Sequence, residues 1–419
     1  MVSNLASQLN RRLSPELQRL LRIAGEIALE QGQGLYLVGG AVRDLLLGRA
    51  NLDLDLVVER DAPRLASLLA DRIGGKVVTH HRFGTAKLRH QNMTIDLATA
   101  RAETYSHPGA LPTVHPGSIA DDLARRDFTI NAMAIYLDPD NFGQLVDPFQ
   151  GEKDLGHKLI RILHQRSFVD DATRMLRAVR YEQRFDFQLE ETTESLLRRD
   201  LSMIHTISGD RIRHELELIF KEALPEKPLR RAAELYLLQE IHAALKGNGW
   251  IAKAFEQARS TANPPSPGLY LSLAVHHFSQ GEGEEFITSL NIPKATARAI
   301  RDTLSLRENM ASLEAPQLSL SAIHRLLRDY LPTSILAWAI ASESPLIQQR
   351  LHLYLDRLRY VKSSLNGKDL QDMGLPPGPQ IGEILEALHE ARLDQRVKTR
   401  AEEVDLVRRW LSQGSGLGI

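Results

Sequence analysis

The sequence predicts a small α/β head with a mixed sheet, followed by an all-α helical body. Up to residue 99, short apolar runs of strand length alternate with amphipathic helical stretches. From Ile119 almost to the end, the helical period dominates. Between these regions, residues 101–118 carry three prolines and two glycines, so we expect a long loop there.

The elements of the head follow from local signals. Residues 14–31 are predicted as a helix because Ser14 can cap its start and Pro15 fits its first turn. Two shorter helices are expected at Val42–Leu47 and Pro63–Ile73. The expected strands are Leu35–Val38, Leu52–Val58, Lys76–Thr79, Thr85–Arg89 and Met93–Thr99.

Beyond the loop, mostly helices are expected. Phe128–Ile135 is predicted as a helical run and 170–187 as one helix, whereas Leu145–Phe149 is predicted as a last strand. Proline and glycine predict helix breaks near 225–228, 262–268, 315–317 and 374–379. We expect four parts, with bounds 1–140, 141–225, 226–360 and 361–419.

Composition excludes several classes of protein. In 419 residues, 52 Lys and Arg nearly balance 53 Asp and Glu, which excludes a uniformly basic nucleic-acid binder but not a locally basic groove. The absence of cysteine excludes disulfide scaffolds, Cys-ligated zinc, iron–sulfur clusters and a cysteine nucleophile. Neither a membrane-spanning run of ~18 apolar residues nor a secretory signal is evident, so we expect a cytoplasmic protein without membrane association.

Three carboxylates predict a metal site in the head. The two-residue period of a strand places Asp53 and Asp55 on one face. Asp96 lies in another predicted strand, and the three carboxylates converge if the two strands are neighbours. Such a group suits Mg²⁺ ions that also bind substrate phosphates, although acids on a solvent-facing edge strand would show the same pattern.

A glycine turn precedes the first of these strands. Gly39 and Gly40 follow a predicted strand and open a predicted helix, where backbone can approach a phosphate closely, and Arg43 adds positive charge. Thirteen residues separate Gly40 from Asp53, so both features belong to one strand–helix–strand unit. This combination indicates phosphoryl or nucleotidyl transfer.

Arginines are concentrated at two further places. Arg125 and Arg126 form an adjacent pair, which can bind a triphosphate or RNA but is also common on ordinary surfaces. On the 170–187 helix, four arginines fan across about 120° of the surface, with Asp171 on their flank. With few acids between them, we expect a local positive field, a solvated helix face being the alternative. These four are Arg174, Arg177, Arg180 and Arg184.

These motifs resemble a known family. LVGGAVRDLLLG followed by LDLDLVV is similar to the signature of polymerase-β-like nucleotidyltransferases, and more narrowly of class II tRNA nucleotidyltransferases. The segments DDLARRDFTINAMA (121–134), VDPFQGEKDL (146–155) and FVDDATRMLRAVRYEQRFDF (168–187) agree, in the family's order. A weaker similarity lies at 365–385. The resemblance implies a nucleotidyltransferase head, a nucleotide-recognising neck, a helical body and a tRNA-binding tail.

The resemblance also implies roles for single residues. Asp53 and Asp55 would bind Mg²⁺ and, with Asp96, activate the 3′-hydroxyl of tRNA. Asp171 and Arg174 would read the base of CTP or ATP in place of a nucleic-acid template, although Asp170 stands where the family usually has Glu. The remaining implied nucleotide-binding residues are Gly39, Gly40, Arg43, Arg126, Arg177 and Arg180.

The implied activity is addition of C, A or both to the 3′ end of tRNA, with CTP and ATP as substrates, tRNA as partner and no protein partner evident. A half-enzyme that adds only CC or only A shares these motifs, as does a bacterial poly(A) polymerase. A non-catalytic RNA-binding protein is a rival of another class, but three intact carboxylates argue against it. His276-His277 lacks acids at metal-ligand spacing, which argues against a phosphohydrolase site.

Overall fold

The computed structural model describes residues 3–49, 54–91, 93–262 and 264–412. It contains two compact units, Met1–Ile241 and His242–Ile419. The first unit holds a mixed seven-stranded sheet, and the described part of the second is built of helices, which confirms the predicted fold class. The finer division at residues 140, 225 and 360 stays a prediction.

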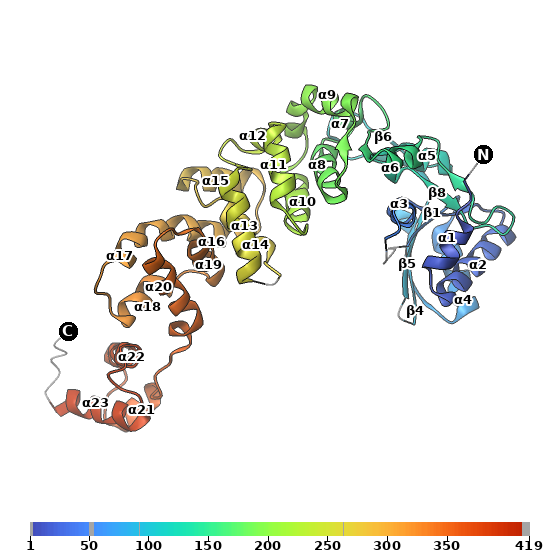
Figure 1. The fold of residues 1–419 in the computed structure, drawn as a ribbon. Helices are drawn as coiled ribbons and strands as arrows, with labels where there is room; N and C mark the ends of the chain where they lie inside the picture. Colours follow the sequence, from blue (N-terminus) through green and yellow to red (C-terminus); the bar gives the residue numbers. More distant parts are fainter. Residues whose placement is uncertain (1–2, 50–53, 92, 263, 413–419) are drawn as a thin grey trace. The chain divides into compact units, whose positions relative to one another are not determined.

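The sheet of the head has the strand order β3-β4-β5-β2-β1-β8-β9. Only the β2–β5 pair is parallel, and the other neighbours are antiparallel. Its strands are β1 (Leu35–Val38), β2 (Asp55–Val58), β3 (Lys76–His80), β4 (Thr85–His90), β5 (Met93–Thr99), β8 (Ala134–Tyr136) and β9 (Leu145–Val146). Figure 1 shows them in blue to green, with α2 and α4 along one side.

The two faces of this sheet are covered differently. The first face packs on α2 (Pro15–Glu30) and α4 (Ala62–Ile73), where Leu88 and Leu97 are buried. On the opposite face, α5 (Ile119–Ala124) packs with Val57 and its neighbours over β1, β2 and β8. Among the described residues, this cluster contains Ala98 of β5 but no residue of β3 or β4, and Lys76, His80, Lys87 and Arg89 lie on that face of β3 and β4.

Several predicted elements are confirmed with small shifts in their bounds. Ser14 caps α2 through its hydroxyl, as its sequence position predicts. The predicted helix after the glycine turn is α3 (Gly40–Leu46), and the last predicted strand shortens to β9. Residues 50–53 lie outside the described residues, so the predicted strand at Leu52–Val58 is seen only from Asp55 onward.

The prediction of a helix at Phe128–Ile135 is wrong. These residues form a 3₁₀ turn, η2 (Thr129–Asn131), followed by β8, which pairs with both β1 and β9. Ala134 and Ile135 are fully buried because β8 is an inner strand. An apolar run this short does not distinguish a buried strand from a buried helix by periodicity.

The predicted loop at 101–118 is instead a β-hairpin. Strands β6 (Arg101–Thr104) and β7 (Thr113–Pro116) pair antiparallel in a sheet of their own. Pro108 and Pro112 fall in the connection between the strands, where no ladder hydrogen bond is required of them. Pro116 ends β7, so the prolines that predicted a loop do not interrupt the hairpin.

The predicted single helix at 170–187 is two helices. A short helix, α7 (Ser167–Asp170), ends at Asp171, whose backbone is extended, and α8 (Thr173–Phe185) follows. The Asp171 carboxylate accepts hydrogen bonds from the backbone N–H and the hydroxyl of Thr173, which stabilises the break. Asp171 therefore lies at the junction of the helices and not on the flank of one.

The remaining elements of the first unit are mostly helical. Strands β10 (Leu159–Ile160) and β11 (Gln188–Leu189) form a small parallel pair. The other helices are α1 (Ala6–Arg12), η1 (His81–Phe83), α6 (Gly151–Gly156), α9 (Glu191–Arg199), η3 (Leu201–Thr206), α10 (Gly209–Phe220), α11 (Glu226–Glu234) and α12 (Leu237–Ile241). Pro228 lies within the first turn of α11, where its missing N–H costs no helical hydrogen bond.

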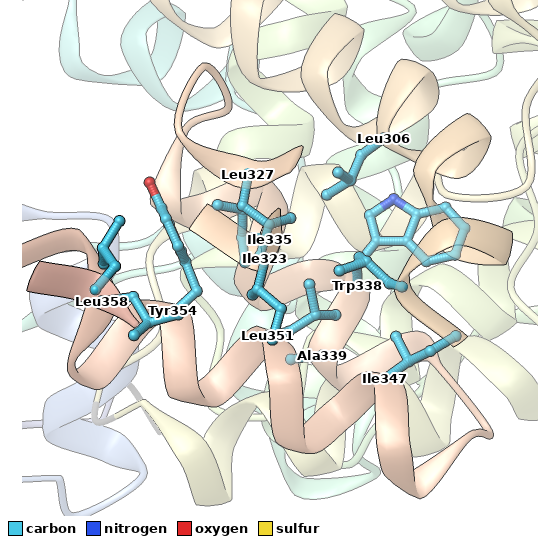
Figure 2. Packing of buried hydrophobic residues seen from close by; sticks show 12 residues of the cluster. Leu306, Ile323, Leu327, Ile335, Trp338, Ala339, Ile347, Leu351, Tyr354 and Leu358 are labelled. Atoms are coloured by element: carbon cyan, nitrogen blue, oxygen red, sulfur yellow. The ribbon is translucent and has the colours of Figure 1, made fainter. Parts of the chain in front are cut away.

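Two hydrophobic clusters lie among the described residues of the second unit from Leu306 onward. The larger one surrounds Leu327, Ile335 and Leu351, and Figure 2 shows Trp338 at one end of it and Tyr354 toward the other. The smaller one lies in and next to the last three helices and comprises Leu365, Leu370, Leu375, Ile384, Leu388 and Val407. The elements are α13 (Gly249–Thr261), α14 (Pro267–Ala274), α15 (Gln280–Ser289), α16 (Lys294–Ser305), η4 (Leu306–Asn309), α17 (Met310–Glu314), α18 (Leu320–Leu327), α19 (Pro332–Ala341), α20 (Pro345–Asp356), η5 (Leu358–Tyr360), α21 (Gly367–Asp372), α22 (Pro379–Leu393) and α23 (Arg400–Ser412).

The predicted breaks at 262–268, 315–317 and 374–379 fall between helices of this unit. The hydroxyls of Ser266, Ser319 and Ser344 cap the helices that follow them, which explains where α14, α18 and α20 begin. No helix among the described residues is long and apolar enough to cross a membrane.

Candidate active site

A cavity of about 570 Å³ lies within the first unit and collects most of the predicted site residues. The start of α3, the start of β2, the hairpin, the segment after α5 and helix α8 all contribute to its wall. The predicted residues that line it are Gly40, Arg43, Asp55, Arg126, Asp171, Arg174 and Arg177.

The glycine turn allows an arginine to lie directly against the backbone. Gly39 has a φ of +65°, a conformation that favours glycine. A Cβ atom at this position would overlap the Nη1 atom of Arg126. Gly39 therefore provides both the turn from β1 into α3 and the space for the Arg126 side chain.

Arg43 is buried and held from three sides. Its Nε and Nη2 atoms donate to Asp44, and its Nη1 atom donates to the Asn131 side chain at 2.6 Å. Its guanidinium also lies over the Phe185 ring, with 4.6 Å to the centroid. These contacts fix a positive charge beside the first turn of α3.

Asp122 anchors the two adjacent arginines, a role that sequence reasoning missed. Its side chain is fully buried, and each of its oxygens accepts from one guanidinium. Arg125 donates to Oδ1 from Nε at 3.0 Å and Arg126 donates to Oδ2 from Nη2 at 2.9 Å. The i,i+3 and i,i+4 spacing along α5 is a signal that could have identified this residue.

Asp127 is a second buried anchor that the sequence did not reveal. It accepts from the Arg177 Nε atom, from the Asn131 amide and from the backbone N–H of Phe128, each at 2.8 to 2.9 Å. Burial alone would raise the pKa of Asp127, but the Arg177 charge and the hydrogen bonds outweigh it and lower the pKa to about 2. Asp127 is therefore ionised at neutral pH and fixes Arg177 in the cavity wall.

The two residues predicted to read the base have separate partners. The Asp171 carboxylate accepts from Arg211 at 2.8 Å as well as from Thr173. Arg174 donates to the Ser167 hydroxyl and to the carbonyl of Arg125. Their side chains therefore bind different partners, and both line the cavity.

The arginines of α8 are more neutralised than predicted. Arg180 is buried against Glu215 at 3.1 Å and is not among the residues that line the cavity. Arg184 lines the cavity but pairs with Glu222. Both acids come from α10 and the residues just after it, so local sequence did not reveal them. The local positive field expected along α8 is thereby reduced.

Two of the three predicted carboxylates, Asp55 and Asp96, lie on neighbouring strands of the sheet. Asp55 and Asp96 are register partners on the parallel strands β2 and β5, so their exposed side chains share one face. Asp96 also pairs with Lys87 of β4, with 3.2 Å from Oδ1 to Nζ. Asp53 lies outside the described residues, and within those residues no three acids or histidines form a metal cluster.

The hairpin contributes a polar wall to the cavity. Glu103 and Tyr105 line it, and the Tyr105 hydroxyl donates to Glu103. Burial and the Glu103 charge raise the pKa of Tyr105 to about 12, so this hydroxyl keeps its proton. Glu103 in turn pairs with Arg125, which connects the hairpin to the anchored arginines.

This arrangement combines three chemical features. Fixed guanidiniums can bind a polyphosphate, paired carboxylates can hold a divalent cation, and Asp171 with Arg174 offers an acceptor and donors to a planar base edge. Together they fit a nucleoside triphosphate and its transfer chemistry.

Comparison with known proteins gives the same result. The family model for the poly A polymerase head domain matches residues 35–161. A second model, described as the probable RNA and SrmB-binding site of polymerase A, matches residues 186–246.

Relatives of the whole chain have three related activities. An A-adding tRNA nucleotidyltransferase of Halalkalibacterium halodurans is 34% identical over 98% of this chain and 96% of its own length. A CC-adding enzyme of Deinococcus radiodurans is 31% identical over 90% of this chain and 89% of its own. A CCA-adding enzyme of Geobacillus stearothermophilus is 28% identical, with 94% and 96% covered.

Solved structures share the fold over nearly the full length. An apo CCA-adding enzyme superposes with a TM-score of 0.84 at 32% identity, covering 98% of this chain and 99% of the other. The Thermotoga maritima CCA-adding enzyme in complex with tRNA gives a TM-score of 0.76 at 32% identity, covering 98% and 100%. The likeness to these relatives and structures extends through both units, and the chain belongs to the tRNA nucleotidyltransferase family.

Proposed function

We propose that this chain adds nucleotides from ATP, CTP or both to the 3′ end of tRNA without a nucleic-acid template, releasing pyrophosphate. One observation carries the proposal: Gly40 of the glycine turn, the anchored arginines, Asp55, Asp171 and Arg174 all line one cavity. A non-catalytic RNA-binding protein has no need of this combination. The chain is then a metal-dependent nucleotidyltransferase.

The carboxylates fit a magnesium ion. Asp55 and Asp96 share one exposed sheet face, and carboxylate oxygens are the ligands that Mg²⁺ prefers. We propose that Asp55 holds the ion together with Asp53, two residues earlier in the sequence. Bound Mg²⁺ would neutralise the triphosphate and polarise its α-phosphate.

The residues of the chain perform the remaining steps. Arg43 and Arg126, fixed by Asn131 and Asp122, bind the charge of the phosphates. A carboxylate oxygen of Asp96 accepts the proton of the RNA 3′-hydroxyl. The deprotonated 3′-oxygen of the RNA attacks the α-phosphorus, the bond from the α-phosphorus to the oxygen that bridges it to the β-phosphate breaks, and pyrophosphate leaves.

Base choice is assigned to Asp171 and Arg174. A carboxylate accepts a hydrogen bond from the exocyclic amine of adenine or cytosine, and a guanidinium donates to a ring nitrogen or carbonyl. Uracil and guanine present the opposite pattern at these positions. Arg177 lines the same cavity and is proposed as a further nucleotide contact, whereas buried Arg180 would act by supporting α8.

Two product specificities have support. Addition of A alone is favoured because the A-adding relative is 34% identical over almost the whole chain, against 28% for the CCA-adding relative. Addition of the full CCA is the second candidate, because CCA-adding structures at 32% identity superpose over both units.

Extension assays test the proposal and separate the candidates. Purified protein is incubated with tRNA lacking CCA, ending in CC or ending in CCA, with each nucleotide separately. An A-adding enzyme extends only the CC-ended tRNA with ATP, and a CCA-adding enzyme also extends the shortened tRNA with CTP. Repeated addition of A to the complete tRNA would indicate a poly(A) polymerase. No incorporation with any combination of tRNA and nucleotide would refute the proposal.

A further inference from the structure

Beyond the catalytic carboxylates, the uncovered face of the sheet continues across β4 and β3. The register of the strands aligns Asp55, Asp96, Lys87 and Val78 in one row across β2, β5, β4 and β3. Alternation along β4 places Arg89 on the same face as Lys87. Arg89 is exposed, and the Val78 side chain is 55% exposed.

This face forms a second hollow of about 620 Å³. Asp55, Asp96, Lys87 and Arg89 line it. It shares Asp55, Arg125 and Arg126 with the nucleotide cavity, so the two hollows meet at Asp55. A transfer between two substrates requires two binding sites that meet in this way.

The charges in this hollow suit a phosphodiester chain. Asp55 and Asp96 are its only lining acids among the described residues. Lys87 and Arg89 are its cations on β4, whereas Arg125 and Arg126 are already paired with the buried Asp122. Lys87 and Asp96 form an ion pair with about half of each side chain exposed, so water competes for both groups and the pair is weak. A phosphate can replace Asp96 as the partner of Lys87 at low cost.

We propose that this hollow binds the single-stranded 3′ nucleotides of the acceptor RNA, with Lys87 and Arg89 on their phosphates. This inference rests on the proposed function and extends it to the second substrate. When RNA binds, Lys87 exchanges its ion pair with Asp96 for one with an RNA phosphate. The Asp96 carboxylate is then available to the terminal 3′-hydroxyl. Lys87 and Arg89 are thus positioning residues for the acceptor.

Binding to two RNAs over a range of salt concentrations tests the inference. One RNA is tRNA ending in CC, and the other is the same tRNA trimmed of its single-stranded 3′ nucleotides. Each phosphate contact to a single strand contributes about 0.7 to the slope of log K against log salt. Lys87→Ala with Arg89→Ala should lower the slope by about 1.4 for the tailed tRNA and leave the trimmed tRNA unchanged.

Controls separate this effect from misfolding. Arg64 is exposed on α4, which covers the other face of the sheet, so Arg64→Ala should behave as wild type with both RNAs. Lys87→Arg keeps the positive charge, so its slope of log K against log salt with the tailed tRNA should stay near that of wild type. Thermal unfolding of the double variant should match wild type because both side chains are solvent-accessible.

The outcomes decide between the inference and its alternatives. Equal slopes for wild type and the double variant on tailed tRNA would overturn it, as would an equal loss on both RNAs. If Lys87 and Arg89 serve pyrophosphate instead, the double variant would weaken inhibition by pyrophosphate without changing the RNA slopes, which also overturns it. Failure of the proposed function is seen separately, as absence of nucleotide addition by wild type.

Discussion

Replacing Asp122 by asparagine tests how the nucleotide cavity holds its adjacent arginines. The carboxylate is fully buried and accepts from both Arg125 and Arg126. Asparagine has nearly the same shape but no charge, and it presents an amide N–H₂ to one of the guanidiniums. The substitution therefore removes the electrostatic anchor without opening a cavity in the core.

The structure sets the expected magnitude. Breaking a buried ion pair by removing one partner costs about 3–5 kcal/mol of unfolding free energy. Arg125 and Arg126 retain 20% and 18% of their side-chain exposure, so partial hydration compensates part of the loss. We expect a cost of about 2–3 kcal/mol. A mobile Arg126 also loses a charge-assisted contact with the nucleotide, worth about 10- to 100-fold in kcat/KM for ATP.

Two measurements check this expectation. Urea unfolding gives the change in unfolding free energy, and steady-state addition to tRNA gives kcat/KM for ATP. Asp121→Asn is the matched control, because Asp121 is the preceding residue on α5 but is exposed and caps the helix with Ser118. Its cost should stay below about 1 kcal/mol, with kcat/KM unchanged.

The reasoning fails if Asp122→Asn resembles the control. A loss below about 1 kcal/mol would mean that the two guanidiniums do not depend on this carboxylate. If Asp122→Asn loses about 2–3 kcal/mol of unfolding free energy, as expected, but keeps its kcat/KM for ATP, Arg126 does not contact the nucleotide.

Three further predictions concern other parts of the chain. Asp171→Ala should lower kcat/KM for ATP or CTP by roughly 5- to 150-fold and reduce the preference for these nucleotides over GTP and UTP. Arg211→Ala removes the same ion pair but should keep this preference, and unchanged kcat/KM ratios among the nucleotides in Asp171→Ala would contradict base reading. Affinity for tRNA should fall steeply and log-linearly with salt and differ only a few-fold among tRNAs, and a flat response would contradict phosphate-driven binding. Burial lowers the pKa of His276 to about 3, so between about pH 3 and 6.5 only the unfolded chain protonates this imidazole, and the unfolding free energy should fall as the pH drops below about 6.5. In urea titrations from pH 7 to 5, the unfolding free energy of His276→Phe should fall less with pH than that of wild type. An equal fall in the two proteins would contradict this prediction.

Much of the head and of the site could be predicted from local sequence. Ser14 marks the start of α2 because capping depends only on adjacent residues. Asp55 and Asp96 were expected to converge if their two strands are neighbours, and the parallel register of β2 and β5 confirms that they are. The Gly39 turn was also visible, because few residues other than glycine adopt its positive φ.

The remaining features depend on contacts between distant residues. β8 is a strand because β1 and β9 pair with it, which no local pattern at Ala134–Tyr136 shows. Arg177 forms an ion pair with Asp127, which lies fifty residues earlier in the sequence, and Arg180 forms one with Glu215, thirty-five residues later. Such partners change a predicted basic face into a set of fixed and mostly neutralised arginines.

The most direct test of the central claim is single-turnover transfer of AMP from ATP to tRNA ending in CC, measured alongside tRNA affinity. Wild type, Asp55→Asn and Asp96→Asn are compared. If these two carboxylates on the open sheet face perform the transfer, both variants should lose activity by at least about 100-fold while binding tRNA within a few-fold of wild type. Activity within about tenfold of wild type in both variants would contradict the account.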